Sequence, residues 1–85
     1  MENEVIFDGA VDAAIDITAE VCPMTYVRTR LALERLSVGQ VLAVRLKGAE
    51  PAENVPRTAL EQGHDVLAID HAPDGTTLIV LRRGE

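Results

Sequence analysis

The segment Val21-Cys22-Pro23-Met24-Thr25 places the strongest constraint on how this chain can fold. Before it, residues 14–18 alternate between apolar and polar, which is typical of a strand with one buried face. After it, residues 23–36 have helical spacing, and a proline suits the first helical position because its missing N–H has no partner there anyway. The sequence therefore predicts a strand-to-helix junction with the only cysteine of the chain beside the helix N-terminus.

The remaining apolar segments predict three more strands and one more helix. The strands are expected at residues 41–46, 65–72 and 77–83, and the second helix at residues 53–62. In that helix, Pro56 is expected in the first turn and Gly63 just after the last residue. The sequence Pro73-Asp74-Gly75 predicts a tight turn, so the last two strands should form an antiparallel hairpin.

This order, β-α-β-α-β-β, predicts a two-layer α/β sandwich. Right-handed crossovers place both helices on one face of a mixed four-stranded sheet. Residues 78–81 are apolar on both faces, which indicates a central strand or a covered sheet face. Residues 1–12 are acidic and weakly patterned, so we expect an N-terminal tail, either mobile or with a short edge strand at residues 5–7, and a folded domain in residues 13–85.

The first predicted helix has two apolar stripes. One holds Tyr26, Leu33 and Leu36, and the other holds Met24, Val27 and Leu31. A helix of a two-layer domain needs only one buried stripe, so the second stripe is either an exposed surface that begins beside Cys22 or partly buried like the first. Arg28 and Arg35, seven residues apart, lie beside this second stripe and are our candidates for partner docking. The alternative is that these basic residues only form a solvated helix face.

The composition excludes several classes of protein. The net charge of −6 and the two aromatic residues, Phe7 and Tyr26, argue against binding of nucleic acid. The chain has no apolar run close to the ~20 residues of a membrane span and no secretory leader pattern. One cysteine cannot form an intramolecular disulfide. We therefore expect a soluble protein of the reducing cytoplasm.

Cys22 is the one residue at which the sequence suggests covalent chemistry. A helix N-terminus stabilises a thiolate, so its pKa is expected to fall below the free value of ~8.5, whereas nearby Glu20 acts in the opposite direction. Without a second cysteine, the thiolate could accept a sulfur atom as a persulfide and pass it on. The alternative is an inert buried cysteine.

The two histidines do not complete another kind of site. His64 and His71 lie in no recognisable catalytic motif, so a cysteine hydrolase has little support. Their odd separation places them on opposite faces of a regular strand, and convergence on a metal would need a bulge. The glycines form no phosphate-binding motif. We expect no metal site and no cofactor.

Several landmarks together resemble the TusA (SirA-like) sulfur-carrier family. The similarity begins with Ile15-Asp16-Ile17 followed by Cys22-Pro23, which resembles a Leu-Asp strand leading into a Cys-Pro-x-Pro motif at the first helix. It continues through Gly39, Glu53-Asn54-Val55-Pro56 and Gly63-His64, and covers residues 15–83. The resemblance implies a β-α-β-α-β-β sandwich and a persulfide on Cys22, received from a desulfurase or rhodanese-type donor and passed to an acceptor protein.

Two departures from that family pattern concern the motif itself. Thr25 replaces the second proline, which restores an N–H and adds a hydroxyl that could hydrogen-bond near the thiolate. The Arg-Gly that often precedes the motif is absent, with Thr18, Ala19 and Glu20 in its place. The hypothesis is a sulfur carrier with Cys22 as nucleophile, Pro23, Met24, Thr25, Arg28 and Arg35 as binding residues, and donor and acceptor proteins as partners. The alternative is a binding or regulatory module without sulfur transfer; either would be a monomer or weak homo-oligomer without nucleic acid or membrane partners.

Overall fold

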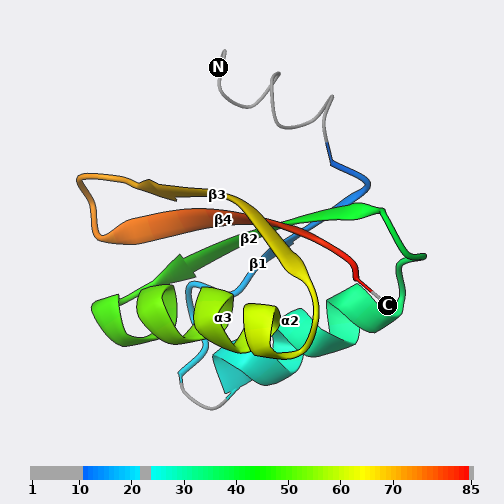
Figure 1. Ribbon diagram of the computed structural model, residues 1–85. Helices are drawn as coiled ribbons and strands as arrows, with labels where there is room; N and C mark the ends of the chain where they lie inside the picture. The colour runs from blue at the N-terminus through cyan, green and yellow to red at the C-terminus, as the bar shows by residue number, and fades with distance from the viewer. Residues whose placement is uncertain (1–10, 22–23, 85) are drawn as a thin grey trace.

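The computed structural model describes residues 11–21 and 24–84, which form two helices and four strands (Figure 1). The predicted tail at residues 1–12 lies almost entirely outside the described residues, as do Cys22 and Pro23. Within these ranges, no helix is long and apolar enough to cross a membrane. The elements in chain order are β1 (Ala13–Asp16), α2 (Met24–Glu34), β2 (Val41–Lys47), α3 (Ala49–Glu61), β3 (Asp65–His71) and β4 (Thr76–Arg82).

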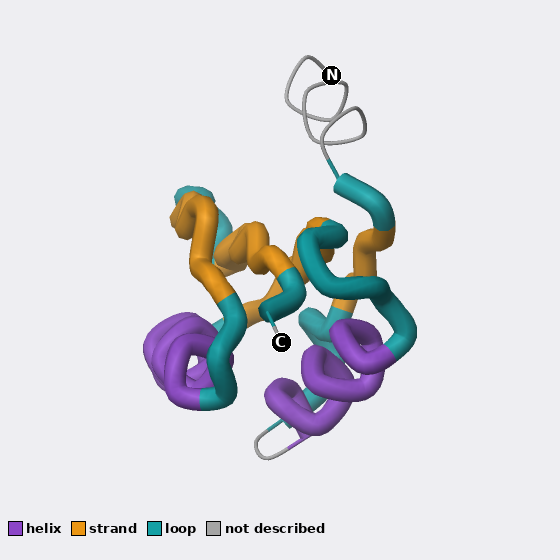
Figure 2. The backbone as a smooth tube through the Cα atoms, turned by 45° about the vertical axis from the view of Figure 1, so that its right-hand side comes forward, coloured by secondary structure: helices purple, strands orange, loops and turns teal. Residues whose placement is uncertain are grey.

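The strands form one mixed sheet in the order β1-β2-β4-β3. β1 pairs with β2 in parallel, with Ile15 opposite Val44, and β4 pairs with β2 and β3 in antiparallel fashion. Both helices lie on the same face of this sheet, side by side (Figures 1 and 2). The predicted two-layer sandwich is therefore confirmed, and β4 is one of the two central strands, as its apolar residues on both faces indicated.

The core lies between the sheet and the helices. Alternate residues of β2 point into it, and Leu42, Val44 and Leu46 are fully buried there. β4 contributes Ile79 and Leu81 in the same way. The helix side of the core is completed by three small or β-branched residues of α3, Ala52, Val55 and Ala59.

α3 differs from the prediction at its N-terminus. It begins at Ala49, four residues before the predicted start at Glu53, so the predicted start of this helix is wrong. Pro51 occupies the first turn, where its missing N–H costs little, but Pro56 lies inside the helix and not in its first turn. Pro56 is buried on the core face of α3, and this packing offsets the helical hydrogen bond that its ring removes.

The end of α3 agrees with the prediction. Gly63 has a φ of 92°, a left-handed conformation that favours glycine. Its N–H donates to the carbonyl of Leu60 at 3.1 Å, and the N–H of His64 donates to the carbonyl of Ala59 at 2.9 Å. This pair of bonds is a Schellman motif, which satisfies the last helical carbonyls and turns the chain back along the helix into β3. The strand bounds differ from the predicted ones by one or two residues.

Candidate functional site

Short-range hydrogen bonds join described residues on both sides of Cys22 in the sequence. Asp16 accepts from the backbone N–H of Thr18 at 3.0 Å and from its hydroxyl at 2.8 Å. These two bonds, the backbone one first, hold the pKa of the Asp16 carboxyl below its usual range. Farther along, the N–H of Met24 donates to the carbonyl of Val21 at 2.7 Å. This bond holds Val21 close to the first residue of α2.

The buried face of α2 is built partly from threonines. Thr25, Thr29 and Leu33, four residues apart, are buried against the core, and Tyr26 and Leu36 pack beside them. The Thr29 hydroxyl donates to the carbonyl of Thr25 at 2.8 Å, so this buried polar group is satisfied within the helix itself. The stripe predicted from Tyr26, Leu33 and Leu36 is therefore the core side of α2.

The opposite face of α2 exposes the second stripe to solvent. We call the α2 patch the four apolar residues Val21, Met24, Val27 and Leu31, whose exposed fractions range from 38% to 74%. Three of them share a helix face, because they are three, four and seven residues apart. Of the two alternatives left open by the sequence, the structure shows the exposed stripe, and Met24 follows Cys22 by two residues in the sequence. An exposed apolar stripe of this kind is a candidate interaction surface.

A groove of about 430 Å³ runs alongside the patch, between α2 and the end of β1. Arg28 and Arg35 both line it, together with Leu31 and Glu20. Arg28 lies 3.4 Å from the Glu20 carboxylate, whereas Arg35 is exposed and makes no ion pair with the described residues. The two arginines predicted for docking are therefore brought together with Leu31 at one groove.

The electrostatics at the start of α2 favour an anion. The first turn of the helix has no acidic residue that would compensate the positive end of its dipole. Glu20, the acid that opposes a thiolate in the sequence, is engaged by Arg28. This ion pair was not predicted, because it depends on how the chain turns between β1 and α2. Arg28 thus partly compensates the negative charge of Glu20, which lies two residues before Cys22 in the sequence.

The predicted binding residues divide between the two faces of α2. Met24, Arg28 and Arg35 are on the exposed face, whereas Thr25 is fully buried on the opposite one. A contact of Thr25 with the sulfur atom stays a prediction. Cys22 and Pro23 lie outside the described residues, so their predicted roles are untested.

The histidines make separate structural contacts. His64 accepts a hydrogen bond from the Gly84 N–H at Nδ1 over 2.9 Å, and Nδ1 of His71 lies 3.0 Å from the Thr77 hydroxyl. Burial, and then the nearby charge of Arg83, lower the pKa of His64. β3 does contain a bulge, between Val66 and Ala68, but the described residues hold no group of three or more possible metal ligands.

A family model and two curated relatives that match this chain are all described as sulfurtransferases or sulfur carriers. The family model described as Sulfurtransferase TusA matches residues 13–83. A "Putative sulfur carrier protein" of Archaeoglobus fulgidus is 32% identical over 69 residues, covering 81% of this chain and 78% of the relative. One with the same description from Thermotoga maritima is 35% identical over 60 residues, covering 71% and 76%.

Among solved structures, the SirA-like protein of Desulfitobacterium hafniense has the same fold. Its TM-score is 0.75, with 24% identity, over 86% of this chain and 99% of that one. This likeness concerns the arrangement of helices and strands.

Proposed function

The chain belongs to the TusA family of sulfurtransferases, and from this premise we propose that it is a cytoplasmic sulfur carrier with Cys22 as its acceptor site. The observation that carries the proposal is the exposed, apolar and basic face of α2, whose residues Val21 and Met24 flank this cysteine in the sequence. Sulfur carriage requires two successive protein encounters at one thiol. A surface suited to protein docking, built from residues that flank the cysteine in the sequence, fits that requirement.

The proposed transfer is an exchange between sulfur atoms. The Cys22 thiolate attacks the outer sulfur of a persulfide on the donor protein. One S–S bond forms as the donor's S–S bond breaks, and the donor leaves as a thiolate. Cys22 then holds the sulfur as its own persulfide. An acceptor nucleophile takes that outer sulfur in the second encounter, and Cys22 leaves as a thiolate, so the cycle needs no external oxidant or reductant.

The start of α2 supports the anionic steps of this exchange. The positive end of the helix dipole favours a thiolate at Cys22, because this residue directly precedes the start of α2 in the sequence. Arg28 engages Glu20 at 3.4 Å and reduces its opposing charge. We therefore expect the Cys22 thiol to ionise below the free value of ~8.5.

Docking is assigned to the α2 patch and its two arginines. The patch offers apolar contact area, while Arg28 and Arg35 add positive charge along one side of it. A donor or acceptor that fits this face has an apolar contact region with acidic residues at its rim. Because Arg35 has no ion pair within the described residues, its guanidinium is available to such a partner.

The direct test is sulfur loading followed by intact-mass measurement. The protein is incubated with a cysteine desulfurase and cysteine, and its mass is recorded without reductant. We expect a species heavier by one sulfur atom that reverts when dithiothreitol is added. Cys22→Ser is the matched control, because it removes the only thiol of the chain.

Two outcomes would contradict sulfur carriage. One is the absence of an adduct while a known carrier is loaded by the same desulfurase. The other is equal uptake by Cys22→Ser. An alkylation rate whose pH dependence gives a thiol pKa at or above the free value, together with no adduct, would instead favour a binding module that has kept the fold and lost the transfer.

A further inference from the structure

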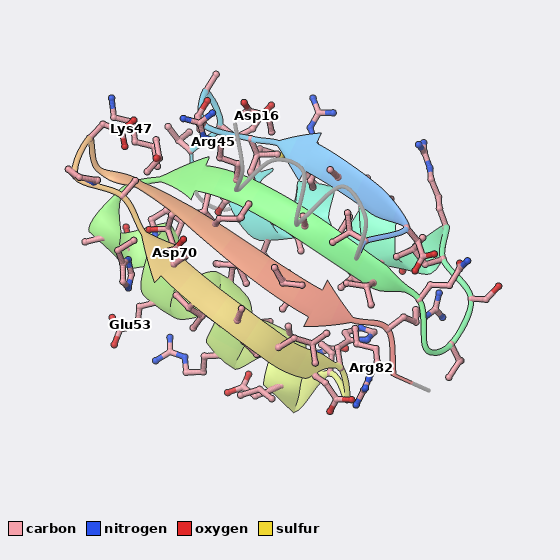
Figure 3. The ribbon with its side chains drawn as sticks, turned by 90° about the horizontal axis from the view of Figure 1, so that it is seen from above. Asp16, Arg45, Lys47, Glu53, Asp70 and Arg82 are labelled. Atoms are coloured by element: carbon pink, nitrogen blue, oxygen red, sulfur yellow. The ribbon has the colours of Figure 1, made fainter. Side chains whose placement is uncertain are left out.

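A second exposed apolar surface lies along α3 and β3, and β3 is the edge strand of the sheet opposite β1. Leu60 on the helix and Leu67 and Ile69 on the strand are each 45% to 57% exposed. β3 ends the sheet, so one side of its backbone has no strand partner among the described residues (Figure 3). α2 contacts β1 and β2 at the other side of the sheet, whereas α3 covers β3 and β4. The two apolar surfaces are thus on different parts of the molecule.

This edge carries a groove at one end. The groove has a volume of about 510 Å³ and lies between the first turns of α3 and the end of β3. Its walls include Ala49, Ala52, Ile69 and Thr77, with Glu53 and His71 among the polar residues. Ile69 belongs both to the exposed edge and to the groove, so the apolar surface continues from one into the other.

The same edge carries an apolar projection at its other end. Leu60 follows Ala49 by eleven residues, which is close to three helical turns, so both lie on one face of α3. The Schellman turn at Gly63 sends β3 back along α3. Leu60 therefore lies near the beginning of β3, and the groove lies near its end. The projection and the groove are separated along a single strand edge.

We propose that this edge pairs two copies of the chain. Antiparallel pairing of two β3 strands across a two-fold axis brings the beginning of each strand to the end of the other. Leu60 of each copy then enters the groove of the other copy, and both exposed strand edges become covered. One surface supplies both halves of the contact, which is what a two-fold interface requires.

Charged residues on the sheet face opposite the helices are compatible with antiparallel pairing of two β3 strands. Asp70 lies near the end of β3 and Arg82 at the opposite end of the neighbouring β4 (Figure 3). Asp70 makes no ion pair with the described residues, and Arg82 is engaged by Asp65 at 2.7 Å. Antiparallel pairing brings Asp70 of one copy to the Arg82–Asp65 pair of the other. The added carboxylate then shares the exposed guanidinium.

The association between the two copies is expected to be weak, because few regular hydrogen bonds join the two β3 strands. The bulge between Val66 and Ala68 falls within the paired segment and interrupts the ladder between the two strands. The dimer is therefore expected to form at high protein concentration and to dissociate on dilution. The α2 patch remains free in both copies, so pairing at this edge is compatible with docking of a partner beside Cys22.

Sedimentation velocity over a wide range of concentrations tests this pairing. The measurement uses Cys22→Ser, which cannot form an intermolecular disulfide, and we expect the apparent mass to rise from 9.2 kDa toward twice that value. Ile69→Lys and Leu60→Lys should each raise the dissociation constant of the dimer at least about tenfold. Leu31→Lys on the α2 patch is the matched control, since its exposure is similar, and should leave the dimer unchanged.

Each outcome supports or contradicts pairing of two copies through β3. A chain that stays monomeric at the highest concentration overturns the proposal, and so does a dimer that Leu31→Lys breaks while Ile69→Lys does not. Thermal melts of the variants show whether each is folded, and the two edge variants are independent of one another. Because Cys22 takes no part, the result is separate from that of the sulfur-loading experiment.

Discussion

The guanidinium of Arg83 donates from Nη1 to the main-chain carbonyl of Leu33 at 2.9 Å, and the same nitrogen lies 2.8 Å from the carbonyl of Leu36. Leu33 lies in the last turn of α2 and Leu36 two residues beyond it, where the chain leaves carbonyls without α-helical donors. A positive side chain there also complements the negative end of the helix dipole. Arg83 follows β4 directly, so this one residue ties the central strand to the helix that carries the proposed docking surface.

Arg83→Ala should therefore lower the free energy of unfolding by about 1.5–3 kcal/mol, the usual range for hydrogen bonds from a charged group. Urea titration followed by circular dichroism gives the value. Arg30→Ala is the control, because Arg30 pairs with Glu34 at 3.0 Å on the exposed side of α2, where such a pair contributes only about 0.5 kcal/mol. Equal losses in the two variants would show that the Arg83 contacts do not stabilise the domain.

His64 should make the stability depend on pH. Its Nδ1 accepts from the Gly84 N–H, which only the form unprotonated at Nδ1 can do, and burial lowers the pKa of its ring below 6.5. The unfolded chain then binds the proton more readily than the folded one. The contribution of His64 is accordingly complete above pH 6.5 and is lost as the pH falls through the lower folded-state pKa.

Urea midpoints measured from about pH 8 to about pH 5 test this expectation. His64→Asn is the matched variant, because its side-chain oxygen can accept from the Gly84 N–H without titrating. Its midpoint should fall less than that of the wild type across the same interval. Asp16 and Asp74 have pKa values held low by hydrogen bonds from Thr18 and Thr76, so their losses come at more acidic pH. A variant that keeps the full pH dependence would rule out His64 as its source.

Much of the fold could be predicted because its strands follow the simplest periodicity. Leu42, Val44 and Leu46 alternate with less apolar neighbours, and that period of two fixes the buried face of β2. The start of α3 could not be predicted in this way. Pro51 and Pro56 weaken the local helix signal, and the burial of Pro56 that offsets this cost exists only in the folded chain. The bulge in β3 likewise depends on pairing with β4.

The candidate site was predictable to the extent that helical spacing determines it. Met24, Val27 and Leu31 share one face of any helix that contains them, so their common surface followed from the sequence. The ion pair between Arg28 and Glu20 did not, because it spans the turn before α2. The full burial of Thr25 and Thr29 could not be predicted from the sequence either. Threonine is polar, and its burial depends on local hydroxyl contacts such as that of Thr29.

The two buried threonines provide a paired test of the hydroxyl at Thr25. If this hydroxyl stabilises a negative sulfur at Cys22, Thr25→Val should slow alkylation of the thiol below its pKa by up to about tenfold, since a hydrogen bond contributes about 0.5–1.5 kcal/mol. Thr29→Val removes an equally buried hydroxyl one turn later and should leave the rate unchanged. Stopped-flow alkylation with a maleimide measures both. Equal alkylation rates in the two variants would show that the Thr25 hydroxyl does not stabilise the thiolate.

Variants at two exposed leucines, one on each apolar surface, distinguish the role of the α2 patch from that of the α3 and β3 surface. Leu31 on the α2 patch and Leu60 on α3 are exposed to a similar extent, at 51% and 57%. Leu31→Lys places a charge in the proposed docking surface and should lower the rate of sulfur loading by a desulfurase about tenfold, because an apolar contact is lost and a charged group must be desolvated.

Leu60→Lys should load at the wild-type rate, measured at a concentration where the chain is monomeric, because α3 lies outside the proposed docking surface. A loss of loading in Leu60→Lys alone would place the donor on α3 and β3 and contradict the assignment of the α2 patch. Equal losses in both variants, with both folded, would mean that the donor contacts both helices. The patch would then be only part of the docking surface, because α2 and α3 pack side by side on one face of the sheet.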